Sequence, residues 1–282
     1  MTPPLIELAG GAGDPILHLA PANGFPPMTY LPLLSRLSAY RCVCLPPRAL
    51  WGDQAPPADY RDWGADAEDL LAGLAAYNLE DVVAVGHSLG GVVSMLALLK
   101  APARFKALIM LDPPIFMPAM LEMIRASWAG GTIKRMPPVQ GARRRRQTFA
   151  SREDAFERFR QKPLFAGWSA ASLWHYVEHG LRPRAADDGV ELIWSADWEA
   201  HYFSTVYLRI WEDLPKLRET PPALIVRGGE SDTFTAEVFA RVQALAPALD
   251  SIELAGQGHL FPLAAPDETA RLIMDWLRTK GL

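Results

Sequence analysis

The chain has 282 residues, of which 50% are apolar and 21% charged, and its net charge is −4. This composition is typical of a folded globular protein and excludes disordered and fibrous chains. The acidic balance gives no global positive field for nucleic acid, and no window approaches the roughly 20 consecutive apolar residues of a membrane span. The opening residues lack the pattern of a secretory signal, so we expect a cytoplasmic protein with a small-molecule partner. The sequence leaves the oligomeric state open.

Short apolar runs bounded by Gly, Pro or Asp alternate with helical patterns along most of the chain. The expected strands are 16–20, 41–46, 82–86, 107–111, 223–227 and 251–255. The expected helices are 28–38, 62–77, 89–100, 235–246 and 267–280. This alternation predicts an α/β fold with a mostly parallel central sheet flanked by helices. The opening residues also predict an antiparallel hairpin with strand 16–20 at the sheet edge.

The alternation lapses between Pro113 and Pro221, where helical stretches are joined by Pro and Gly. We therefore expect a core of residues 1–112 and 222–282 that carries an inserted helical cap, residues 113–221. Six of the nine tryptophans lie in this cap, and aromatic side chains often line apolar ligand pockets. Trp198 and Tyr202, in the segment leading back to the core, are candidate substrate contacts.

A strand-to-helix junction carries the motif Gly86-His87-Ser88-Leu89-Gly90, which fits G-x-S-x-G. In such a nucleophile elbow the serine backbone is strained so that its hydroxyl projects above the sheet, and larger side chains two positions away would collide. The helix that begins at Leu89 directs its positive end toward the place where an acyl oxyanion forms. The motif therefore predicts Ser88 as a catalytic nucleophile.

With this motif, the chain resembles the α/β-hydrolase superfamily over nearly all of its length except the cap. The resemblance implies a triad in the order Ser, acid, His, with the acid after the strand beyond the cap and the histidine after the last strand. Asp232 and His259 match these positions. Glu230 is a nearby rival for the acid, and Asp112, after the strand that leads into the cap, is the other place where the superfamily keeps it.

The resemblance also implies an oxyanion hole made by two backbone N–H groups. One belongs to Leu89, and the other comes from the loop 20–30, which resembles a His-Gly-Phe-Pro loop with Asn23 in place of His. This points to Phe25 as the second donor and to Asn23 as a substrate contact, although Asn23-Gly24 also suits an ordinary turn.

Two further patterns have ordinary explanations. His175 to His179 match H-x-x-E-H, a zinc motif, but no third ligand is evident, so we interpret them as a solvated helix end and expect no metal. Arg143 to Arg146 form the only dense charge run, which is usually solvated; alternatively, one or two of these arginines bind a carboxylate or phosphate of the substrate.

Together these features predict a serine hydrolase without metal or organic cofactor. A serine at the elbow argues against epoxide opening and halide displacement, which use a carboxylate there in this superfamily. We expect hydrolysis of a small to medium, largely apolar carboxylic ester through an acyl-enzyme on Ser88. A thioesterase, a carbon–carbon bond hydrolase of the same fold, and a ligand receptor with negligible turnover remain alternatives.

Overall fold

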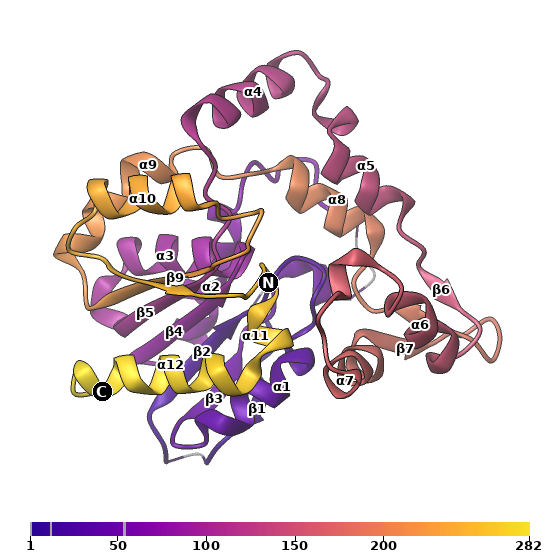
Figure 1. Cartoon of the computed structure of the whole chain (residues 1–282), viewed down its shortest axis with the longest axis horizontal. Coiled ribbons are helices and arrows are strands. Elements are labelled where there is room, and N and C mark those ends of the chain that lie inside the picture. The colour runs from indigo at the N-terminus through magenta and orange to yellow at the C-terminus, as the bar shows by residue number, and fades with distance from the viewer. Residues whose placement is uncertain (1, 12, 53–54) are drawn as a thin grey trace.

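The computed structural model describes residues 2–11, 13–52 and 55–282, and a seven-stranded sheet lies at its centre (Figure 1). The strands lie in the order β1-β3-β2-β4-β5-β9-β10. Their bounds are β1 Ile6–Ala9, β2 Ile16–Ala20, β3 Arg41–Cys44, β4 Val82–His87, β5 Phe105–Leu111, β9 Ala223–Gly228 and β10 Asp250–Leu254. Neighbouring strands are parallel from β3 to β10. The predicted α/β fold is confirmed.

The first strand differs from the prediction. β1 is an antiparallel edge strand, but it pairs with β3, with Ile6 opposite Cys44. The expected hairpin between β1 and β2 is therefore wrong. The reason is that both edges of β2 are already occupied by parallel partners, β3 on one side and β4 on the other.

Helices cover both faces of the sheet and form two apolar layers with it. One layer contains α2 (Gly64–Ala76), α3 (Leu89–Lys100) and α10 (Ala236–Leu245). The other contains α1 (Leu31–Leu34), α11 (Phe261–Ala264) and α12 (Pro266–Thr279). Side chains of β4 alternate between them: Val82 and Ala84 pack in the first layer, Val83 and Val85 in the second. Two covered faces explain why the central strands are mostly apolar.

The helix predicted over 28–38 is broken. It consists of the 3₁₀ turn η1 (Pro27–Tyr30), the single turn α1 and the 3₁₀ turn η2 (Ser35–Leu37). Pro27 and Pro32 have no N–H to donate, which limits regular α-helical bonding in this stretch. In the described part of the chain, no helix combines the length and apolar character needed to cross a membrane.

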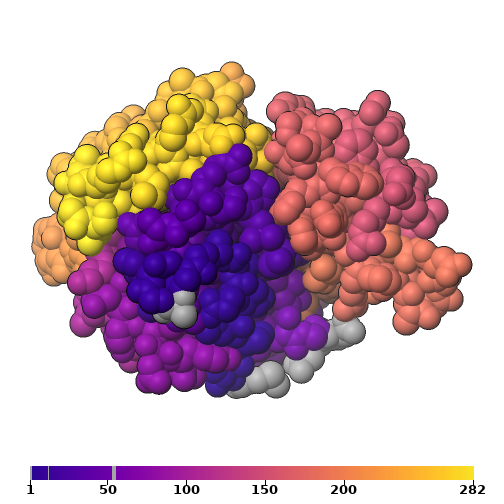
Figure 2. All heavy atoms as spheres, turned by 90° about the horizontal axis from the view of Figure 1, so that it is seen from below, coloured from indigo at the N-terminus to yellow at the C-terminus, as the bar shows by residue number. Residues whose placement is uncertain are grey.

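The stretch between β5 and β9 is an insertion, because these two strands are neighbours in the sheet. We call residues 113–221 the insertion. Its helices are α4 Pro118–Ala129, α5 Pro137–Arg144, α6 Arg152–Phe159, α7 Ala170–Gly180, α8 Ala196–Ser204 and α9 Ile210–Asp213. Much of the insertion forms a lobe beside the core (Figure 2).

The insertion also contains a small antiparallel sheet that the sequence did not predict. Its strands are β6 Thr148–Phe149, β7 Leu181–Pro183 and β8 Val190–Leu192, and β8 lies between the other two. Strands of two or three residues are too short to show an alternating pattern. The insertion, expected as a helical cap, thus consists of helices and one small sheet.

Candidate active site

Ser88 occupies the sharp turn between β4 and α3. Its backbone has φ 54° and ψ −121°, in a region that residues with a side chain rarely adopt. The Ser88 N–H donates to the Leu111 carbonyl at 2.9 Å, and the Ser88 carbonyl accepts from the Gly91 N–H at 2.9 Å. These bonds fix the turn to β5 and to the first turn of α3. The strand–turn–helix context that the motif requires is present.

The glycines of the motif are explained by close backbone approach. A Cβ atom on Gly86 would lie 2.3 Å from the Gly90 carbonyl oxygen, and one on Gly90 would lie 2.1 Å from the Ala20 carbonyl oxygen. Both distances are far shorter than any normal contact. Only glycine therefore allows β2, the elbow and α3 to meet at this point.

The acid beside His259 is Asp112. His259 lies in the loop between β10 and α11, and its Nδ1 is 2.7 Å from Asp112 Oδ2. Asp232, in contrast, is exposed, and its carboxylate accepts a bond from the adjacent Thr233 hydroxyl at 3.3 Å. The expectation that Asp232 steadies His259 is wrong in its geometry. Because β5 and β9 are neighbours, the residue that follows β5 reaches the same place.

Asp112 is held rigidly in a fully buried position. Its backbone has φ 45°, and its N–H donates to the Val226 carbonyl at 2.7 Å. Oδ1 accepts from the Gly228 N–H at 2.7 Å, and Oδ2 accepts from the Ser231 hydroxyl at 2.5 Å as well as from His259. These bonds compensate a carboxylate that has lost all contact with water. Ser231 is buried with its hydroxyl on Asp112, whereas the next residue, Asp232, is exposed. No sequence signal pointed to Ser231.

A buried chain of hydrogen bonds connects the loop after β2, the elbow and His259. The Ala22 N–H donates to the Tyr30 hydroxyl oxygen at 3.0 Å, and this hydroxyl lies 2.7 Å from His87 Nδ1. His87 Nε2 lies 3.0 Å from the His259 carbonyl oxygen. Tyr30 therefore donates to Nδ1, and the Nε2–H of His87 donates to His259. Burial, then the nearby His259, lowers the pKa of His87, so its ring is neutral.

The contact between the elbow and His259 is made by His87, the residue before Ser88. The ring centroid of His87 is 5.3 Å from that of His259. Between the Ser88 hydroxyl and the His259 ring, the described residues show no hydrogen bond. Catalytic hydrogen bonds are often long until a substrate is bound, so this arrangement is compatible with proton transfer.

The two expected oxyanion donors differ in their surroundings. Leu89 is the first residue of α3, so its N–H has no acceptor within the helix and lies at the positive end of the helix dipole. The Phe25 N–H donates to the Ala22 carbonyl at 3.1 Å, in a turn where Gly24 has φ 86°. The Phe25 N–H can donate to an oxyanion only if its hydrogen bond becomes shared between the oxyanion and the Ala22 carbonyl, or if the bond to Ala22 breaks.

The other candidate contacts lie where the insertion meets the core. The Asn23 side-chain amide donates to the Glu199 carbonyl at 3.0 Å, and its Oδ1 is buried with no partner among the described residues. Trp198 is buried and packs on Tyr202, with ring centroids 5.5 Å apart. The buried Tyr202 hydroxyl donates to Asp66 Oδ1 at 3.0 Å. Tyr202 therefore bonds the insertion to α2 of the core, and Trp198 packs at the same junction, with its ring centroid 6.4 Å from that of Tyr60.

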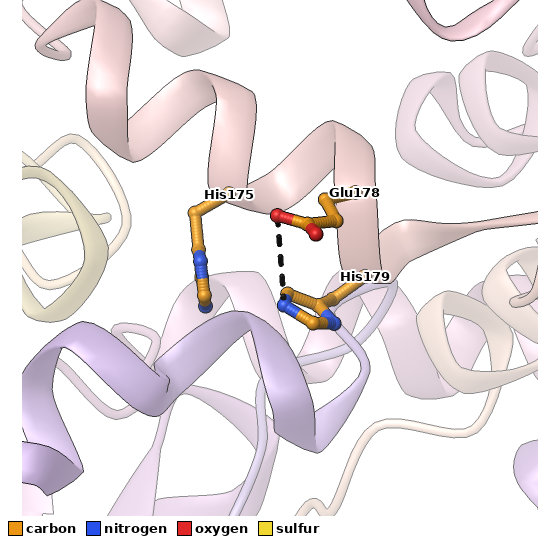
Figure 3. A group of neighbouring side chains, drawn as sticks. All are labelled: His175, Glu178 and His179. Atoms are coloured by element: carbon orange, nitrogen blue, oxygen red, sulfur yellow. Dashed lines mark ion pairs between the residues drawn. The ribbon is translucent and has the colours of Figure 1, made fainter.

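The residues of the H-x-x-E-H match form a cluster on α7 (Figure 3). One ligand atom from each of His175, Glu178 and His179 lies within 4.8 Å of the others. His175 Nε2 is also 3.1 Å from the Met28 carbonyl oxygen. Imidazole and carboxylate groups are zinc ligands, but a structural zinc site needs four ligands and this cluster supplies three among the described residues. That no metal binds here stays a prediction.

The profile of the alpha/beta hydrolase family matches residues 16–272. Among curated proteins, Ethanol acetyltransferase 1 of Hanseniaspora uvarum is 35% identical over 74 residues, which are 26% of this chain. The matched part spans only 21% of the acetyltransferase.

Solved structures share the fold over nearly the whole chain. E-2-(acetamidomethylene)succinate hydrolase is similar with a TM-score of 0.76 and 22% identity, and the match covers 97% of this chain and 94% of the hydrolase. The thioesterase domain from the curacin biosynthetic pathway is similar with a TM-score of 0.67 and 18% identity, and the match covers 96% and 94% of the two chains. At such identities these similarities establish architecture.

Proposed function

Since this chain belongs to the α/β-hydrolase family, we propose that it is a serine hydrolase that cleaves a small to medium, largely apolar carboxylic ester. The observation that carries the proposal is the strained Ser88 turn together with a His259 imidazole that is bonded to the buried Asp112, His259 being connected to the elbow through His87. A serine on an elbow, a base and a buried acid are the parts that acyl transfer needs.

The reaction proceeds in two steps. The Ser88 hydroxyl attacks the ester carbonyl carbon while His259 Nε2 accepts its proton, and the Leu89 N–H stabilises the oxyanion. When the intermediate collapses, the carbon–oxygen bond of the ester breaks and the alcohol leaves with the proton from His259. Water then attacks the acyl-enzyme by the same route, which releases the acid and restores Ser88. Asp112 holds His259 with Nδ1 protonated and stabilises its cation.

The same acyl-enzyme also supports related reactions. A thioester would acylate Ser88 in the same way, and an alcohol in place of water would make the protein an acyltransferase. The short match to an ethanol acetyltransferase favours testing the second possibility. Adding ethanol to the assay separates the two, because a transferase yields ethyl ester whereas a hydrolase yields acid.

A fluorophosphonate probe tests the nucleophile directly. We expect covalent labelling of the protein at Ser88, identified by peptide mass spectrometry, and no labelling of a Ser88→Ala variant. Ser94, buried on the adjacent helix, provides the control, because Ser94→Ala should label normally. Equal labelling of Ser88→Ala would disprove the assignment. Treatment with a chelator should leave hydrolysis intact because no step uses a metal.

A further inference from the structure

A cavity of about 620 Å³ lies within the insertion, outside the Ser88 site. Its wall is built from the end of α5, from α6 and from the segment that follows α6. Five basic side chains line it, against one acidic side chain: Arg144, Arg145, Arg146, Arg158, Lys162 and Glu199. Such a bias in charge is unusual for a cavity in a chain whose net charge is negative.

The positive charge of this cavity is only partly neutralised. Glu199 accepts from Arg145 at 2.6 Å, and Asp154 accepts from Arg158 at 2.7 Å. Arg144, Arg146 and Lys162 have no ion pair within the described part of the chain. Arg144 donates to Gln140, and the Arg146 Nε–H donates to the Thr148 carbonyl at 2.8 Å, so both are steadied by neutral groups. The guanidinium groups keep donors for a ligand.

The floor of the cavity is apolar. Phe149, Phe159 and Phe165 are all buried and line it, with ring centroids 5.1 Å apart for the first two and 5.3 Å for the last two. A site that combines aromatic walls with a few charged groups binds organic ions whose apolar part fills the cavity. Inorganic anions would use the cationic rim alone.

Arg145 connects the cavity to the proposed oxyanion loop. A Cβ atom on Gly24 would lie 3.2 Å from Arg145 Nη1 and 3.5 Å from Glu199 Cδ. Arg145 also donates through Nη2 to the Tyr176 hydroxyl at 2.5 Å, and the Tyr176 ring packs on Phe25. The basic wall of the cavity is therefore in contact with the turn that leads to Phe25.

We propose that this cavity binds an anionic group of the substrate, a carboxylate or a phosphate attached to an apolar body, while the ester bond lies at Ser88. This inference rests on the proposed ester hydrolysis and adds a substrate class to it. Arg144, Arg146 and Lys162 bind the anion, and the three phenylalanines contact the adjoining apolar part. Arg145 stays paired with Glu199, and both remain in contact with Gly24 in the loop after β2.

Matched esters test the proposal through selectivity. The substrates are aryl esters of one acyl length that end in a carboxylate, in a phosphate or in a neutral amide. We expect kcat/KM of the native protein to be about 10- to 100-fold higher for at least one anionic ester than for the amide. An Arg144→Gln, Arg146→Gln double variant should lose most of this ratio, and Arg125→Gln, an exposed arginine of α4, should keep it.

Binding without turnover provides a second readout. Calorimetry on Ser88→Ala uses three probes: a non-hydrolysable analogue of the carboxylate ester, a non-hydrolysable phosphonate analogue of the phosphate ester, and inorganic phosphate. Their binding should weaken when salt is added. It should also weaken when the two arginine substitutions are combined with Ser88→Ala. Preference for one organic analogue identifies the anion. Equal kcat/KM for anionic and neutral esters, or a ratio unchanged in the double variant, would overturn the inference. If the inference fails but Ser88→Ala abolishes ester hydrolysis, the proposed function still holds. If hydrolysis survives in Ser88→Ala, the proposed function is wrong as well.

Discussion

The core and the insertion hold their functional groups by different means. In the core, backbone atoms fix the site: Gly90 has no room for a side chain, and Asp112 is buried among backbone and hydroxyl donors. In the insertion, short helices and a small sheet present exposed arginines around a cavity. A rigid core of this kind suits a fixed chemistry, whereas exposed side chains of the insertion can vary without disturbing it.

The largest difference between the two regions should appear in catalysis. We expect His259→Ala to lower kcat/KM for a p-nitrophenyl ester by about 10⁵-fold or more, because the members of a triad act as a unit. His179→Ala, a histidine of the insertion, should change it less than about twofold. Steady-state assays of both variants measure the contrast, and comparable losses would erase the distinction between the regions.

Stability should separate the regions in the same way. Gly90→Ala places a Cβ 2.1 Å from the Ala20 carbonyl oxygen, so we expect a loss of about 3 kcal/mol or more in the free energy of unfolding. Gly141→Ala in α5 meets nothing within 4 Å and should stabilise the protein by about 0.5–1 kcal/mol. Urea unfolding measures both. A tolerated Gly90→Ala would show that the elbow can relax.

The junction between the regions should respond to pH. Burial raises the pKa of Asp66, which accepts from Tyr60 and Tyr202, to about 7. Unfolded Asp66 loses its proton near pH 4, so the folded state binds more protons between these values, and stability should fall as the pH rises from about 4 to 7. Asp66→Asn should remove this part of the slope. Identical pH profiles of unfolding for the two proteins would contradict the assignment.

The core was easier to predict from the sequence than the insertion. α3 begins and ends where its pattern indicates, at Leu89 and Lys100. The prediction succeeds here because the apolar residues face the buried layer and the motif glycines are required by close backbone contacts. The acid was harder to assign, since the ends of β5 and β9 are neighbours in space and chain order cannot choose between Asp112 and Asp232. The turn at Ser231, whose hydroxyl donates to Asp112, decides between them, and the sequence pattern does not show that turn.

The insertion was less predictable for physical reasons. Its strands β6, β7 and β8 have two or three residues each, so their pairing depends on tertiary contacts rather than on pattern. The sequence identified Arg143 to Arg146 as a charge run but could not show that only some of these side chains meet a cavity. Trp198 and Tyr202 were candidates as pocket residues, and both are buried where the insertion packs on the core.

A pair of isosteric substitutions distinguishes Asp112 from Asp232 as the acid that supports the His259 base. Ester hydrolysis by Asp112→Asn should fall by about 10⁴-fold in kcat, because an amide at this position favours the wrong tautomer of His259. Asp232→Asn should retain activity within about twofold, and both variants should unfold cooperatively. A large loss in Asp232→Asn together with normal turnover in Asp112→Asn would show that Asp232 is the acid.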